Sequence, residues 1–142
     1  MLTILTFAAA LAATSGAPAA AQQCIHGVGE TTDNAARRRQ ALTAARTINT
    51  MQANQPGAAG RRFLRHDELA NAPSAPNPRE AAGTAANAIS LKPGDDIVPG
   101  WKLTLDVTDQ GYWFLIKDTV DPCGFAYVSN QNGVIFNAEP IR

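Results

Sequence analysis

The strongest constraint on the fold of this chain is a change in hydrophobic period near residue 92. Residues 35–52 contain no glycine or proline, and their apolar side chains recur at the spacing of a helix. Beyond residue 92 the apolar side chains recur at every second position, as in a half-buried strand. The clearest such run is Trp101, Leu103, Leu105 and Val107. A helix followed by strands predicts an α+β domain.

The predicted helix has a narrow apolar face made mainly of alanine. Thr32 or Asp33 is expected to cap its N-terminus. The helix seam consists of Ala41, Ala44, Ile48 and Met51, with Ala45 and Gln52 beside it. The residues predicted to point away are Arg39, Thr43, Arg46 and Thr50. Small side chains let a helix approach a sheet closely, so we expect the seam to pack on a β-layer. The facing residues of that layer are predicted to be Trp101, Leu103, Leu105, Val107 and Phe114.

Turn-forming sequences divide the C-terminal third into an antiparallel meander of four predicted strands. These strands cover residues 101–108, 112–117, 125–129 and 134–136. The second is apolar on both faces, which indicates a central strand. Asn132-Gly133 between the last two is typical of a tight hairpin. The other expected elements are a helical turn at 67–69 and a short second helix at 78–89.

The first 21 residues are uncharged and mostly apolar, and they end in Ala19-Ala20-Ala21. An apolar run followed by a break and small residues is typical of a secretory signal peptide, with cleavage expected after Ala21. The alternative is an uncleaved membrane anchor, but the run is short, rich in alanine and interrupted by Ser15-Gly16-Ala17-Pro18. We therefore expect a signal peptide at 1–21 and a single α+β domain at 22–142, located in the periplasm or secreted.

The chain contains two cysteines, Cys24 and Cys123, which lie about 100 residues apart. In the oxidising compartment that the signal peptide implies, two cysteines are expected to form a disulfide. The alternatives are two free thiols or a pair of metal ligands. Zinc normally takes four ligands, and only His26 and His66 are available to complete the set, without a recognisable spacing. We predict the disulfide and no metal site.

Charge and hydropathy limit the classes of partner. Twelve basic residues balance twelve acidic ones, so the net charge is close to zero. Nucleic-acid binding normally requires an excess of basic residues, and we expect no such partner. No second apolar run approaches the length of a membrane-spanning helix, so no membrane span is expected after signal cleavage.

No group of residues has the spacing of a catalytic site. Ser90 and Ser129 do not lie in a nucleophile-elbow motif. His26 lies close to Cys24, but a disulfide removes that thiol as a nucleophile. His26 and His66 are therefore interpreted as loop histidines. We expect a non-enzymatic protein that has no catalytic residues and no cofactor.

One pair of carboxylates offers ligands for a cation. Asp95 and Asp96 lie in a turn, and Asp121 is a possible third ligand. Calcium takes about six to eight oxygen ligands, more than these side chains supply. A solvated turn is the favoured interpretation.

The arginines form two local groups in the sequence. Arg37-Arg38-Arg39 points in three directions around the predicted helix, so these residues do not form one binding face. A solvated surface with ion pairs to Asp33 or Glu30 is favoured. The second group, in the following loop, consists of Arg61, Arg62 and Arg65.

Four aromatic residues allow two interpretations, a ligand-binding surface or packing in the core and on the sheet faces. They are Trp101, Tyr112, Trp113 and Phe114. Their alternation along strands favours packing, although the pattern does not place both tryptophans in the core.

Three stretches carry a family resemblance. The predicted helix ends in Ala44-Ala45-Arg46-Thr47-Ile48-Asn49-Thr50-Met51-Gln52, and Phe63 and Asp67-Glu68-Leu69 lie in the region that follows. Near the C-terminus stands Tyr127-Val128-Ser129-Asn130-Gln131-Asn132-Gly133-Val134-Ile135. Over residues 35–138 these stretches resemble the helix end, the αβ-loop and the closing polar turn of type IV pilins and type II secretion pseudopilins. The leader resembles a conventional signal peptide, so we expect the globular domain without the family's apolar stem.

The resemblance implies a long helix on an antiparallel sheet and a role through protein–protein contacts, accessory to a pilus or a type II secretion system. Two alternatives remain open. One is a small periplasmic hydrolase or ligand-binding protein, for which a deep pocket containing His26 or His66 beside a carboxylate is expected. The other is a membrane-tethered minor pseudopilin whose true start lies upstream of Met1.

Overall fold

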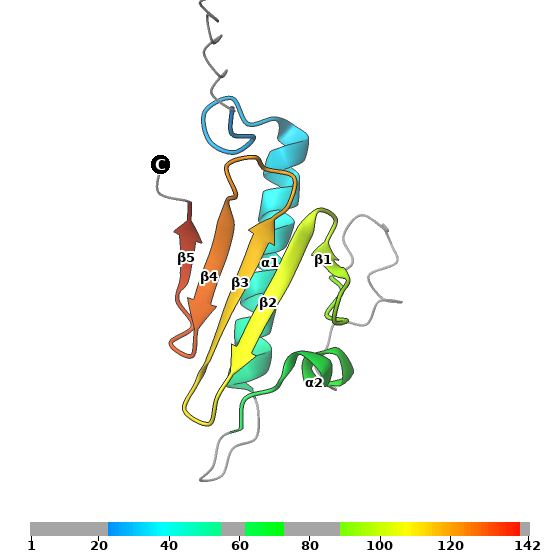
Figure 1. Cartoon of the computed structure of the whole chain (residues 1–142), viewed down its shortest axis with the longest axis vertical. Helices are drawn as coiled ribbons and strands as arrows, with labels where there is room; N and C mark the ends of the chain where they lie inside the picture. Colours follow the sequence, from blue (N-terminus) through cyan, green and yellow to red (C-terminus); the bar gives the residue numbers. More distant parts are fainter. Residues whose placement is uncertain (1–22, 55–61, 73–88, 140–142) are drawn as a thin grey trace, which may run out of the picture.

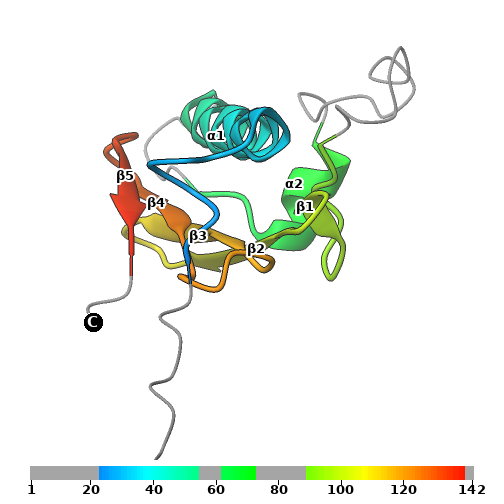
Figure 2. The same ribbon diagram turned by 90° about the horizontal axis from the view of Figure 1, so that it is seen from above.

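The computed structural model describes residues 23–54, 62–72 and 89–139, and it has an α+β fold (Figure 1). The helices are α1 (Thr32–Ala53) and α2 (His66–Asn71). The strands are β1 (Asp96–Val98), β2 (Trp101–Val107), β3 (Tyr112–Asp118), β4 (Ala126–Asn130) and β5 (Ile135–Ala138). Helix α1 lies along one face of the sheet, and α2 lies near the edge that carries β1 (Figure 2).

The sheet has five strands rather than the four predicted. They lie in the order β1-β2-β3-β4-β5, and every neighbouring pair is antiparallel. The additional strand, β1, covers only three residues, and its pairing with β2 is irregular between Asp96 and Val98. So short a strand has no alternating pattern that a sequence can display. The prediction that the strand at 112–117 is central is confirmed, because β3 is the third of the five.

Helix α1 begins earlier than predicted. Its N-cap is Thr31, whose Oγ1 accepts a hydrogen bond from the backbone N–H of Asn34 at 3.3 Å, so neither Thr32 nor Asp33 is the cap. Three adjacent polar residues can each cap a helix, and the sequence does not distinguish between them. Asp33 lies in the first turn, where its negative charge interacts favourably with the positive end of the helix dipole.

The predicted helix seam is confirmed. Ala41, Ala44 and Ile48 are fully buried, and Met51 is 2% exposed. The opposite residues Arg39, Thr43, Arg46 and Thr50 are exposed. The prediction of the facing residues is also confirmed. Trp101 and Phe114 are buried in the same core, and Leu103, Leu105 and Val107 pack against it. Alanine is the reason α1 can lie so close to the sheet.

Polar side chains also join α1 to the rest of the fold. Asn49 accepts a hydrogen bond from the Tyr112 hydroxyl at 2.9 Å and donates to Ser129 Oγ at 2.9 Å. The buried amide of Gln52 donates to the carbonyl of Leu64 and accepts from its N–H, both at 2.8 Å. Buried polar groups that are satisfied in this way fix the position of the helix along the sheet.

The helical turn predicted at 67–69 is confirmed as part of α2. The predicted helix at 78–89 lies outside the described residues except for its last position, and the predicted signal peptide at 1–21 lies outside them entirely. Among the described residues, no helix has the length and hydropathy needed to cross a membrane.

Candidate functional site

The predicted disulfide between Cys24 and Cys123 is present, with a Cα–Cα distance of 5.2 Å. It joins the segment that precedes α1 to the loop between β3 and β4. The start of the helix is thereby linked covalently to the end of the sheet. This clasp brings together residues that are far apart in the sequence.

The most concentrated group of charges lies next to the disulfide. His26 Nδ1 forms a hydrogen-bonded ion pair with Oδ2 of Asp121, and His26 Nε2 lies 3.1 Å from Oε1 of Glu139. The Asp121 side chain is fully buried, and its Oδ1 accepts a hydrogen bond from the backbone N–H of Cys123 at 2.8 Å. The imidazole also packs on Phe125, with 4.6 Å between ring centroids.

The geometry of His26 indicates a structural role. Both ring nitrogens face a carboxylate, and only a protonated imidazole can donate two hydrogen bonds. Burial lowers the pKa of His26, but the hydrogen bonds and charges of Asp121 and Glu139 outweigh it, so the pKa is raised. Both ring nitrogens are engaged by carboxylates, which favours a structural role over that of a free base. His26 closes an ionic clasp, and its interpretation as a plain loop histidine was too simple.

The same contacts shift the pKa of Asp121. Burial alone would raise the pKa of Asp121. The hydrogen bonds from the Cys123 backbone and from His26 have a larger effect in the opposite direction, so the pKa is lowered overall. The sequence contained a signal for this pair, because His26 lies two residues after Cys24 and Asp121 two residues before Cys123. Once the disulfide is predicted, the two side chains are expected to be neighbours.

The pKa shifts of His26 and Asp121 predict that the protein is most stable within a limited range of pH. The contribution of His26 is complete below the unfolded pKa of 6.5 and is lost as the pH rises through the raised pKa of the folded state. The contribution of Asp121 is present above its unfolded pKa of 3.8 and is lost as the pH falls through its lowered pKa. We expect the free energy of unfolding to be greatest between these two values and to decline on either side.

Urea unfolding of the native chain and of His26→Gln, from about pH 5 to about pH 9, tests this. His26→Gln should lower the stability at the acidic end by about 1.5–3 kcal/mol, the usual range for a hydrogen bond to a charged group. It should also flatten the decline at alkaline pH. Parallel pH profiles for the two proteins would show that His26 does not carry the effect.

The three arginines of α1 point in different directions, as predicted. Arg38 forms a two-point ion pair with Glu30, with N···O distances of 2.8 and 2.7 Å, which confirms one of the two expected partners. Arg37 reaches Asp118 of β3 at 3.1 Å, a contact that the sequence did not predict. Arg39 is exposed. Arg37 therefore links α1 to the sheet, Arg38 links it to the preceding segment, and the three side chains do not form one binding face.

The candidate calcium ligands are not brought together. Asp96 is paired with Lys102, with 2.8 Å between Oδ1 and Nζ, and Asp95 lies 3.2 Å from the Ser90 hydroxyl. Asp121 faces His26 at the disulfide. Within the described part of the chain, no three histidine, cysteine or acidic side chains are arranged to hold a metal ion. His66 begins α2, on a different element from the partners of His26.

One face of the sheet is left uncovered by the described elements (Figures 1 and 2). Side chains alternate between the two faces of a strand, so the residues opposite the seam can be read from the register. Leu115 pairs with Val128, and Val128 pairs with Phe136, in a row across β3, β4 and β5. Phe136 is 57% exposed, while Leu115 and Val128 are half-buried. We call these three residues the apolar row.

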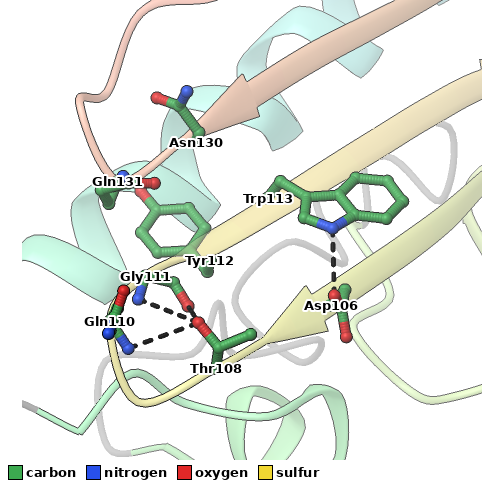
Figure 3. A pocket seen from close by; sticks show the side chains of 8 residues that line it. All are labelled: Asp106, Thr108, Gln110, Gly111, Tyr112, Trp113, Asn130 and Gln131. Carbon is green, nitrogen blue, oxygen red and sulfur yellow. Dashed lines mark hydrogen bonds between the residues drawn. The ribbon is translucent and has the colours of Figure 1, made fainter.

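The neighbouring row on the same face carries an exposed tryptophan. Trp113 of β3 pairs with Asp106 of β2 on one side and with Asn130 of β4 on the other. Its indole Nε1–H donates to Asp106 Oδ2 at 3.1 Å (Figure 3). These residues, with the β2–β3 turn and Gln131, line an open hollow of about 320 Å³. The two tryptophans therefore differ: Trp101 is in the core, and Trp113 is on the surface.

Comparisons with protein-family models, with curated proteins and with solved structures gave no match to this chain.

A second hollow, of about 190 Å³, lies beside His26. Arg38 and Glu139 line it together with Phe125. The hydrolase alternative predicts a deep pocket that contains a histidine beside a carboxylate. This hollow contains His26 beside Glu139, but it is open and not deep. None of the described residues that line it carries a hydroxyl or thiol nucleophile.

Proposed function

We propose that this chain is an exported, non-enzymatic, pilin-like domain that acts through protein–protein contacts, as an accessory to a pilus or a type II secretion system. The layout of one long helix across an antiparallel sheet is consistent with that resemblance. The disulfide fits an oxidising compartment, in agreement with the predicted signal peptide at residues 1–21.

The observation that carries the proposal is the one-sided covering of the sheet. Helix α1 buries one face, and the apolar row of Leu115, Val128 and Phe136 lies on the other. Phe136 is exposed, and Leu115 and Val128 beside it are half-buried, so the row is a continuous apolar strip of the kind found at contact surfaces. Strand β5 is also an edge strand, so its outer backbone groups are open to pairing with another chain.

The state of His26 supports the non-enzymatic part of the proposal. Both ring nitrogens of His26 contact carboxylates, those of Asp121 and Glu139, and the nearby Cys24 is in the disulfide. We therefore infer no role for His26 as a general base or for Cys24 as a nucleophile.

Photocrosslinking in intact cells tests the contact surface. A photoreactive amino acid at Phe136 should give a discrete adduct, because the partner covers this side chain. Mass spectrometry of the adduct should identify a component of a pilus or a secretion system. Thr43, exposed on the outer side of α1, is the matched control position and should give no adduct.

Equal adducts at Phe136 and Thr43, or none at Phe136, would contradict a partner on the uncovered face. An adduct with an envelope protein unrelated to pili or secretion would retain the contact surface and contradict the accessory role.

A further inference from the structure

Trp113 is unusual for its position in the fold. Its side chain is 45% exposed, whereas Trp101, the other tryptophan, is 1% exposed. A large aromatic ring in water loses the free energy that burial supplies, and exposed tryptophan is concentrated at binding sites. The indole is also held in a fixed orientation, because its N–H donates to Asp106 across the strand pair (Figure 3).

The backbone around the hollow is equally well fixed. The Thr108 hydroxyl accepts hydrogen bonds from the N–H groups of Gln110 and Gly111, at 3.3 and 3.2 Å, which closes the β2–β3 turn. The N–H of Gln131 donates to the Tyr112 carbonyl at 3.2 Å and ties the β4–β5 turn to β3. A site whose walls are already ordered binds without a further entropic cost of ordering them.

Hydrogen-bonding groups around the indole remain available. Asp106 uses Oδ2 for the indole, and its Oδ1 makes no hydrogen bond to the described residues. The side-chain amides of Gln110 and Gln131 likewise make none within the described segments, and both line the hollow. An amide offers donors and an acceptor together, and a carboxylate offers acceptors. Such a mixture suits a ligand that carries several hydroxyl groups.

The charge of the lining residues further limits the class of ligand that the hollow can bind. Among the described residues that line the hollow, Asp106 is the only charged one, and none is a lysine or arginine. Phosphates and carboxylates are therefore disfavoured as ligands, because each needs a cationic or N–H-rich partner. The volume of about 320 Å³ lies at the lower end of the range for small-molecule sites, which is about 300–1,000 Å³.

We propose that this hollow binds a neutral pyranose saccharide. One face of a pyranose ring presents C–H groups that stack on the exposed indole of Trp113, while its hydroxyls donate to Asp106 and exchange hydrogen bonds with Gln110 and Gln131. This site goes beyond the proposed protein contacts and uses different residues from the apolar row. A failure of the saccharide proposal would therefore not affect the proposed protein–protein contacts, and the reverse is also true.

Nuclear magnetic resonance of the indole N–H signals tests the proposal with two probes, a trisaccharide of β-1,4-linked N-acetylglucosamine and one of β-1,4-linked glucose. At least one probe should shift the Trp113 signal in a saturable manner and leave the signal of buried Trp101 unchanged. In calorimetric titrations with the same probe, which do not depend on the Trp113 signal, Trp113→Ala should weaken binding about tenfold or more, as loss of an aromatic contact implies. Gln131→Ala, an exposed position, should weaken it less while leaving the fold intact.

Phe136→Ala is the matched control, since it removes an exposed aromatic ring from the same face outside the hollow. It should bind the saccharide as the native chain does. Absence of a shift with both probes would overturn the proposal. Unchanged affinity in Trp113→Ala would also overturn it, and if that variant does not fold, unchanged affinity in Gln131→Ala decides against it.

Discussion

Ile48→Asp is expected to unfold the domain. Ile48 is fully buried in the hydrophobic core between α1 and the sheet. The change removes an apolar side chain and places a charge in its position, which together cost about 4 kcal/mol or more. A domain of this size is stable by only about 5–15 kcal/mol in total. Circular dichroism should show loss of the cooperative thermal transition or a large fall in melting temperature.

Thr43→Asp is the matched control on the same helix. Thr43 is exposed, and threonine and aspartate have similar helix propensities. Its melting temperature should stay close to that of the native chain. If Ile48→Asp also melts normally, then α1 does not pack on the sheet through this seam.

Removal of the disulfide is the second change with a large expected effect. Cys24 and Cys123 are separated by 99 residues, and closing so long a loop lowers the entropy of the unfolded chain by an amount worth about 4–5 kcal/mol. Cys24→Ser together with Cys123→Ser should lower the free energy of unfolding in urea by that order. The clasp of His26 and Asp121 should weaken as well, because the disulfide holds these segments together.

Reductant provides the control for this comparison. It should destabilise the native chain and have no effect on the double variant, which has no cysteines to reduce. Equal stability of the two proteins under oxidising conditions would show that the disulfide is not a main source of stability.

The parts of the fold that sequence analysis predicted are those with a repeating pattern. The seam of α1 follows from the helical spacing of Ala41, Ala44 and Ile48, and the inward face of β2 follows from strict alternation. Strand β1 was missed because three residues cannot show a period. The start of α1 was misplaced because Thr31 has the same capping chemistry as the polar residues that follow it.

The candidate sites depend on pairings between distant residues, and these are harder to predict. The contact of Arg37 with Asp118 joins α1 to β3 and has no signature in either segment. The position of Trp113 was accessible in principle: if Phe114 faces the helix, its neighbour on the strand must face away. The residues around Trp113 could not be predicted in the same way, because their positions depend on the register between strands and on the β4–β5 turn.

We propose that the chain is exported, and that its disulfide fixes the start of α1 to the sheet and leaves the other face of the sheet for partners. The most direct test is mass spectrometry of the protein isolated from its own cells, after alkylation of free thiols without reductant. The account predicts a chain that begins at Gln22, with no alkylated cysteine and with a peptide in which Cys24 is linked to Cys123. Recovery of two alkylated cysteines in a chain that retains residues 1–21 would contradict it.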